Sequence, residues 1–139
     1  MHLYVVFAHP SKGSFSYAVL QAFARGLREA GHTFEMGDLY EMGFESELDE
    51  GQYFRELGLD PDAPVPDDVK AEQDKIDRAD ALAFVYPVWW SYCPAKLKGW
   101  FDRVLTYGYA YFYYADEQRS SRIAIEKAVV LCSAGHPIE

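Results

Sequence analysis

The sequence is short of cysteine, of basic residues and of long apolar runs, and each shortage excludes a class of protein. Its two cysteines, Cys93 and Cys132, lie among apolar neighbours and give no disulfide framework, so we expect a reducing, cytoplasmic setting. The 13 Lys and Arg against 22 Asp and Glu give a formal net charge of −9. This balance disfavours a nucleic-acid partner, because phosphate contacts need a surplus of positive charge. No apolar stretch approaches the roughly 20 residues of a membrane span, and residues 1–8 lack the basic start of a secretory signal.

Acidic residues are themselves missing from two parts of the chain. Residues 1–28 contain no acid, and residues 81–115 contain one, Asp102, whereas residues 35–80 contain 16 acids and four bases. An anionic ligand would need such acid-free surroundings, since a nearby carboxylate opposes its binding. Burial would remove charges as well, so the pattern alone leaves both interpretations open.

Three short apolar runs without polar alternation, residues 3–8, 81–86 and 127–133, predict strands that are buried on both faces, as in a parallel sheet. A further strand is predicted over residues 32–39. Helices are predicted over residues 17–30, capped by Ser14 or Ser16 and ended by Gly31, over 67–78, capped by Asp67 or Asp68, and over 94–105. Residues 40–66 are predicted to be a long acidic excursion with short helical turns. Strands alternating with helices predict one doubly wound α/β domain over residues 1–139.

The loops at residues 9–16, 87–93 and 133–136 follow predicted strands, so they should meet where ligands bind in such sheets. The first loop leads into a helix start rich in serine, where free N–H groups favour an anion. An ordinary capped helix would look the same. The second loop carries Trp89, Trp90 and Tyr92, whose flat walls suit a planar ring. A core plug or a dimer contact remains an alternative for these aromatics.

Aromatic residues are dense beyond this loop as well. Thirteen of the 31 residues from 84 to 114 are aromatic, so we expect the stretch 107–114 to line a pocket or an oligomer interface. His9, Cys93 and His136 lack the paired spacing of a zinc site, and we predict no metal. Cys93 has no implied base, which disfavours nucleophilic catalysis.

Two segments resemble a known family. Residues 9–18, HPSKGSFSYA, are similar to the flavin-phosphate loop of the NAD(P)H:quinone oxidoreductases, the DT-diaphorase-like proteins. Residues 87–104, PVWWSYCPAKLKGWFDRV, are similar to that family's most specific motif, and residues 107–111 continue it. The resemblance implies a flavodoxin-like fold with strand order 2-1-3-4-5. It also implies a homodimer that binds FAD, or FMN in some branches, and reduces quinones with NAD(P)H by a ping-pong mechanism.

The resemblance also implies roles for particular residues. The flavin's phosphate end would be held by His9, Ser14, Phe15, Ser16 and Ala18. The ring and its ribityl chain would be bordered by Pro87, Val88, Trp89, Trp90 and Ser91. The ring's polar edge would be approached by Ser133, Ala134 and Gly135. Tyr111 and Tyr113 match positions in the family's nicotinamide and quinone pocket, partly across the dimer.

The chain departs from the family pattern at two loops and at its end. Ser16 stands where the family often has asparagine, and Ser133-Ala134-Gly135-His136 replaces a Thr-Thr-Gly-Gly loop. The fifth strand and the family's assisting Tyr and His would lie beyond Glu139, so we hypothesise a fragment or a part supplied elsewhere. Two other functions fit the resemblance: a non-enzymatic flavin-binding regulatory subunit of a potassium-efflux system, and a flavodoxin-type electron carrier.

Overall fold

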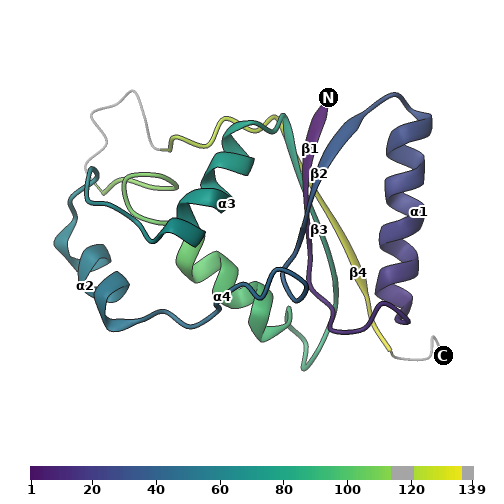
Figure 1. Cartoon of the computed structure of the whole chain (residues 1–139), viewed down its shortest axis with the longest axis horizontal. Helices are drawn as coiled ribbons and strands as arrows, with labels where there is room; N and C mark the ends of the chain where they lie inside the picture. Colours follow the sequence, from purple (N-terminus) through teal and green to yellow (C-terminus); the bar gives the residue numbers. More distant parts are fainter. Residues whose placement is uncertain (114–120, 136–139) are drawn as a thin grey trace.

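A computed structural model describes residues 1–113 and 121–135 of the chain. Four strands form one parallel sheet in the order β2-β1-β3-β4, which confirms the predicted flavodoxin-like order for these strands. Their bounds are His2–Phe7 for β1, Thr33–Asp38 for β2, Ala81–Pro87 for β3 and Lys127–Ser133 for β4. All four carboxyl ends therefore lie along one edge of the sheet, the lower edge in Figure 1.

Helices cover the two faces of this sheet. Helix α1 (Phe15–Glu29) lies on one face, and α3 (Asp67–Asp77) and α4 (Ala95–Val104) lie on the other, with α2 (Glu50–Gly58) beyond them (Figure 1). The caps of α1 agree with the prediction. Ser14 is the N-cap, its side chain accepts a hydrogen bond from the Tyr17 N–H, and Gly31 follows the helix at φ 74°.

Two predictions about the acidic excursion need correction. The N-cap of α3 is Pro66, which has no side-chain acceptor and makes no capping hydrogen bond. Asp67 and Asp68 lie within the first turn of the helix, and the carboxylate of Asp68 pairs with the guanidinium of Arg103. The excursion also contains a regular nine-residue helix, α2, rather than isolated helical turns. Its N-cap is Asp49, whose carboxylate accepts from the Gln52 N–H at 2.7 Å.

Strand β4 is at the predicted residues but is not buried on both faces. It is an edge strand, and only its β3 side is paired in the described part of the chain. Val129 and Leu131 pack toward α1, whereas Val130 on the opposite face is 55% exposed. The apolar run predicted the residues of β4 correctly. The burial of these residues, however, depends on the place of β4 at the edge of the sheet.

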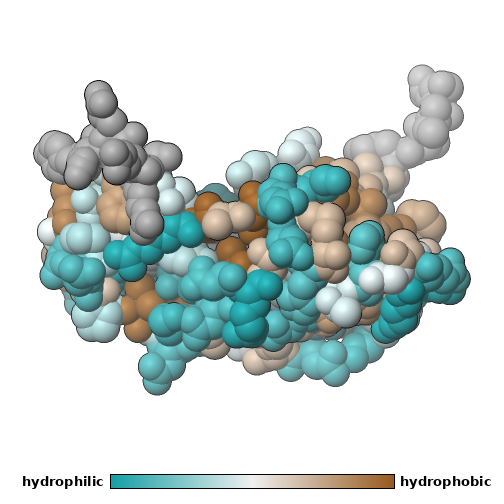
Figure 2. Space-filling model, turned by 90° about the horizontal axis from the view of Figure 1, so that it is seen from above, coloured by the Kyte–Doolittle hydropathy of each residue, from teal (hydrophilic) through white to brown (hydrophobic). Residues whose placement is uncertain are grey.

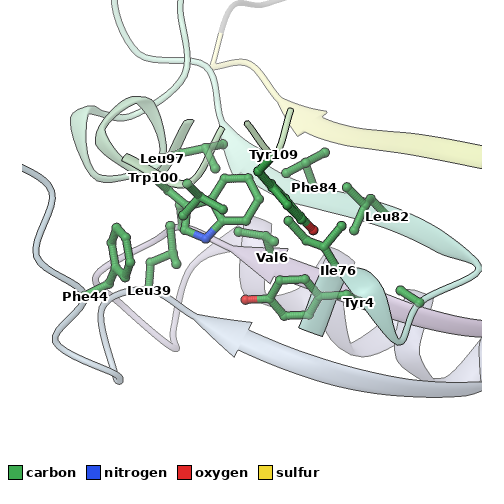
Figure 3. Close-up of a cluster of buried hydrophobic side chains, with 13 residues drawn as sticks. Tyr4, Val6, Leu39, Phe44, Ile76, Leu82, Phe84, Leu97, Trp100 and Tyr109 are labelled. Atoms are coloured by element: carbon green, nitrogen blue, oxygen red, sulfur yellow. The ribbon is translucent and has the colours of Figure 1, made fainter. Parts of the chain in front are cut away.

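The core has one apolar layer on each face of the sheet. The layer against α1 contains Leu3, Val5 and Phe7, and the layer against α3 and α4 contains Tyr4 and Val6 (Figure 3). In the second layer the buried carboxylate of Glu72 accepts from the Tyr4 hydroxyl and, at 2.7 Å, from the Trp100 indole N–H. These bonds tie α3 to β1 and α4.

Much of the surface is hydrophilic on the face seen in Figure 2, with hydrophobic residues gathered toward its middle. Among the residues that the structure describes, no helix has the length and apolar character needed to cross a membrane.

Candidate active site

A cavity of about 660 Å³ opens at the carboxyl edge of the sheet, where the loops after β1 and β3 meet the end of β4. This is the edge at which ligands of doubly wound sheets bind. The three loops that the sequence placed at strand ends all contribute to its wall. Its lining residues are His9, Ser14, Phe15, Ser16, Pro87, Val88, Trp89, Trp90, Ser133 and Gly135.

The start of α1 presents free donors to this cavity. The N–H groups of Phe15 and Ser16 make no hydrogen bond within the described residues, since they precede the first intrahelical bonds. The N–H of Tyr17 is satisfied by Ser14 Oγ at 3.1 Å. Two open N–H groups at the positive end of a helix dipole form a site for an oxyanion.

His9 lies at the end of β1 and lines the cavity. Its Nδ1 lies 2.9 Å from the backbone nitrogen and 3.1 Å from the carbonyl oxygen of Ser11, so Nδ1 is engaged within the loop and Nε2 is the ring nitrogen left for a ligand. The ring lies 5.7 Å from that of Trp89, at an interplanar angle of 59°. The imidazole therefore lies between the loop of residues 9–16 and the indole of Trp89.

The aromatic wall is built on a tight hairpin. Trp89 and Tyr92 exchange two backbone hydrogen bonds, of 2.9 and 3.1 Å, around Trp90 and Ser91. Both central residues have positive φ, 52° and 64°, as a type I′ turn requires. This backbone leaves the Trp90 side chain fully exposed at the cavity, while Trp89 is 40% exposed.

A serine pair closes the third side of the cavity. Ser16 Oγ, in the first turn of α1, lies 2.8 Å from Ser133 Oγ, the last residue of β4. The carbonyl of Ser133 accepts from the Val88 N–H at 2.7 Å, so β4 is also fixed to the loop after β3. The two sequence departures from the family pattern are thus in direct contact.

Charge around the cavity suits an anionic ligand. No acidic residue is among the described residues that line it. Lys12 does not line it either, because its ammonium pairs with Glu41 at 2.9 Å, and this hydrogen bond raises the pKa of Lys12. The anion site therefore depends on N–H and O–H donors.

Several predicted site residues lie elsewhere. Ala18, Ser91 and Ala134 are exposed and are not in the cavity wall. Tyr111 and Tyr113 belong to an aromatic cluster around Tyr107, with ring centroids 5.4 to 5.7 Å apart. His136 of the third loop lies outside the described residues.

The 87–104 motif divides into a site half and a scaffold half. Residues 87–90 line the cavity, whereas Gly99 and Arg103 hold the acidic excursion to α4. A Cβ on Gly99 would lie 2.0 Å from the carbonyl oxygen of Ser46. The guanidinium of Arg103 donates to the Glu45 carbonyl at 2.6 Å and to Gln52 Oε1 at 3.1 Å.

Neither cysteine is among the described residues that line the cavity. Cys93 packs against the core layer below α4, and burial raises the pKa of its thiol. A raised pKa keeps the thiol protonated at neutral pH, which opposes a nucleophilic role. The described residues contain no group of three or more His, Cys, Asp or Glu side chains that could hold a metal.

A second cavity, of about 790 Å³, lies between α3 and residues 121–124. Its charged side chains bind groups of the protein itself: Arg122 faces Asp62 at 3.7 Å, and Arg55 donates to the Ala63 carbonyl at 2.9 Å. We therefore place the site in the smaller cavity, where open donors and aromatic walls converge.

Known proteins share this architecture. The family model described as flavodoxin-like fold matches residues 1–139. The structure of an NAD(P)H:quinone oxidoreductase from Methanothermobacter marburgensis superposes with a TM-score of 0.93 at 64% identity, covering 99% of this chain and 66% of that one. General stress protein 14 of Treponema denticola, solved in complex with FMN, gives a TM-score of 0.64 at 25% identity, covering 99% and 64%.

Sequence relatives agree with these structures. NAD(P)H dehydrogenase [quinone] 1 of Cavia porcellus is 36% identical over 124 residues, which are 80% of this chain and 45% of that protein. The chain spans about half the length of the curated relatives it matches. On the matched family model and the strand order, the chain belongs to the flavodoxin-like family, and the relatives to which it is similar include proteins named NAD(P)H:quinone oxidoreductase.

Proposed function

We propose that residues 1–139 form one flavin-binding domain of an NAD(P)H-dependent oxidoreductase that reduces quinones or related acceptors. The observation that carries the proposal is the cavity at the carboxyl edge of the sheet. It combines open N–H donors at a helix start with a tryptophan wall, and no acid is among its described lining residues. This combination fits a ligand with a phosphate at one end and a planar ring at the other.

The lining residues divide between the two ends of such a ligand. The N–H groups of Phe15 and Ser16 and the His9 Nε2 would hold the phosphate end. The ring end would lie against Trp89 and Trp90, with Val88, Ser133 and Gly135 near its polar edge. FAD is the proposed flavin, with FMN as the alternative. The FMN complex of the Treponema denticola neighbour supports a flavin but does not choose between them.

A bound flavin would supply the chemistry of hydride transfer between NAD(P)H and the acceptor, for which we propose a ping-pong sequence. The chain's own residues would bind and orient the flavin and shield it from water. The donors of α1 fix the phosphate end, and the 89–92 hairpin holds the aromatic wall in a single conformation through its two backbone hydrogen bonds. Such prior positioning reduces the ordering that the reaction would otherwise require.

The proposal includes a homodimer in the cytoplasm. Tyr113 is 65% exposed, and the neighbouring helix α2 leaves Phe54 and Leu57 about 60% exposed. Exposed apolar groups at this density are typical of a protein interface. A partner subunit that packs against Tyr113 and α2 would place Tyr111 and Tyr113, the family's substrate-pocket positions, near the proposed flavin cavity of that partner. Light scattering after gel filtration tests this, since a monomer at micromolar concentration would contradict the dimer.

The flavin proposal is tested on purified protein by its absorption spectrum and by chromatography of the flavin released on denaturation. We expect a bound flavin that NADH or NADPH bleaches without oxygen and that a quinone re-oxidises. A colourless protein that takes up neither FAD nor FMN refutes the proposal. A flavin that neither nucleotide bleaches refutes the enzyme and leaves only a binding role.

Two variants separate site effects from general damage. Trp89→Ala removes part of the ring wall and should weaken flavin binding at least tenfold, because a large aromatic contact is lost. Lys70→Ala removes an exposed helix pair with Asp74 and should leave binding unchanged. Equal losses in both variants would indicate destabilisation rather than a site.

A further inference from the structure

The contact between Ser16 and Ser133 joins two loops that are 117 residues apart in the chain. Both side chains line the cavity, one from the first turn of α1 and the other from the end of β4. A serine hydroxyl carries one hydrogen, so only one member of the pair can donate to the other. The second hydrogen remains free for another acceptor.

Burial decides which serine donates. Ser16 is 3% exposed, and Ser133 Oγ is the partner that its hydroxyl has among the described residues. A buried hydroxyl without an acceptor is costly, so the Ser16 hydrogen points to Ser133. Ser133 is half-buried at the cavity wall, and its own hydrogen can therefore point toward a ligand.

We propose that Ser16 is a positioning residue whose hydroxyl donates to Ser133 Oγ and so directs the Ser133 O–H into the cavity as a ligand donor. The inference rests on the proposed flavin site and deepens it. The backbone N–H of Ser16 stays open for an anion, but its side chain acts through Ser133 instead of contacting the phosphate. The Ser133 hydroxyl binds an acceptor atom of the ring or of its ribityl chain.

The assignment explains why the two departures from the family pattern occur together. An asparagine at residue 16 would present an amide in place of a hydroxyl, and a different partner would then be needed at the end of β4. Here two small hydroxyl side chains fit the 2.8 Å contact between α1 and the strand end.

Binding of FMN and riboflavin to the purified protein tests the inference, because riboflavin lacks only the phosphate. Ser16→Ala and Ser133→Ala should each weaken both ligands by the same factor, about three- to tenfold for a lost hydrogen bond. The double variant should be no weaker than Ser133→Ala alone, since the two residues act as one donor chain. Ser133→Thr, which keeps the hydroxyl, should restore binding of both ligands.

Ser14→Ala is the matched control at the same helix start. Loss of this cap disturbs the N–H groups that face the anion, so it should weaken FMN more than riboflavin. If Ser16→Ala does not fold, Ser16→Cys takes its place, because it fills the buried space with a weaker donor. A thermal melt of each variant verifies folding before binding is compared.

The outcomes separate this inference from the proposed function. A wild-type protein that binds neither FMN nor riboflavin overturns both. Normal wild-type binding with additive losses in the double variant overturns the coupling alone. A Ser16→Ala variant that weakens FMN and leaves riboflavin unchanged shows that the Ser16 hydroxyl contacts the phosphate, which also overturns it.

Discussion

Trp90 and Ser91 occupy the left-handed backbone region that L-residues normally avoid. Each non-glycine residue held there costs about 1–2 kcal/mol, and here two are adjacent, at φ 52° and 64°. Asn-Gly would be the usual choice for such a turn. The chain instead places an indole at the first position, where it is fully exposed beside the cavity. Backbone strain of this kind is retained at functional sites, where the strained conformation holds a side chain in the orientation that function requires.

Ser91→Gly should relieve half of this strain. We expect the free energy of unfolding to rise by about 1 kcal/mol, since glycine adopts positive φ without a steric cost. Urea titration of the apoprotein measures the change. Ser11→Gly is the control, because its backbone is not left-handed and its side chain accepts from the Gly13 N–H. It should lower stability, and a matching fall in Ser91→Gly would contradict the strain.

At the scale of elements, helix α4 is the part that holds the acidic excursion in place. Its glycine, Gly99, allows the backbone of Ser46 to approach, and Arg103 binds the excursion from the next turn. Burial of Arg103 is stabilised because Asp68, Gln52 and the Glu45 carbonyl together satisfy its donors. The half of the family motif beyond residue 94 thus has a structural explanation.

Gly99→Ala and Gly26→Ala form a matched pair of helical substitutions. At Gly99 the new Cβ would lie 2.0 Å from a carbonyl oxygen, so we expect a loss of at least 2 kcal/mol in stability, as for overpacked cores. At Gly26 a new Cβ meets nothing within 4 Å, and alanine should add up to about 1 kcal/mol through helix propensity. Thermal melts measure both, and the same sign in both variants would contradict the close approach.

Helix α2 shows why part of the fold was not predictable. Its buried side chain is polar: Gln52 donates to the Arg103 carbonyl at 2.7 Å, while Tyr53, Phe54 and Leu57 are exposed. The buried face of α2 therefore lacks the usual apolar periodicity, and the sequence contains no apolar pattern that predicts this helix. Strands β1, β3 and β4 were predictable because unbroken apolar runs have few other uses in a domain of this length.

At the scale of the whole molecule, the order of strands in the sheet determines which parts of the site could be predicted from the sequence. Strand-end loops were predictable because parallel strands bring them to one edge, and ten of the thirteen residues expected at the flavin line one cavity. The Ser16–Ser133 contact required β4 to lie beside β3 with its last residue turned toward α1. Periodicity and spacing carry no information about such a contact.

Alkaline pH should destabilise the molecule through its buried tyrosines. Burial and the neighbouring carboxylates Glu72 and Asp77 raise the pKa of Tyr4 and of Tyr109 well above the ordinary value. The folded state thus keeps both phenols protonated, whereas the unfolded chain releases these protons near pH 10. Their contribution to stability is complete below pH 10 and is lost as pH rises beyond it.

Tyr109→Phe should make this decline shallower by about 1.4 kcal/mol per pH unit above pH 10. Urea midpoints between pH 8 and pH 11 measure the slope. Tyr53→Phe, at a half-exposed position on α2, is the matched control and should leave the slope as in the wild type. Parallel curves for Tyr109→Phe and the wild type would contradict the role of burial.

The three tryptophans lie in three different environments: Trp100 is fully buried, Trp89 is 40% exposed and Trp90 is fully exposed. Two of them border the proposed flavin site, and the third is in the core. The molecule therefore carries its own optical reporter. Iodide should quench the red-shifted emission of the pair at the cavity and leave the blue emission of Trp100, and a ligand in the cavity should protect that pair. Binding could then be followed separately from unfolding, in one sample and without a label.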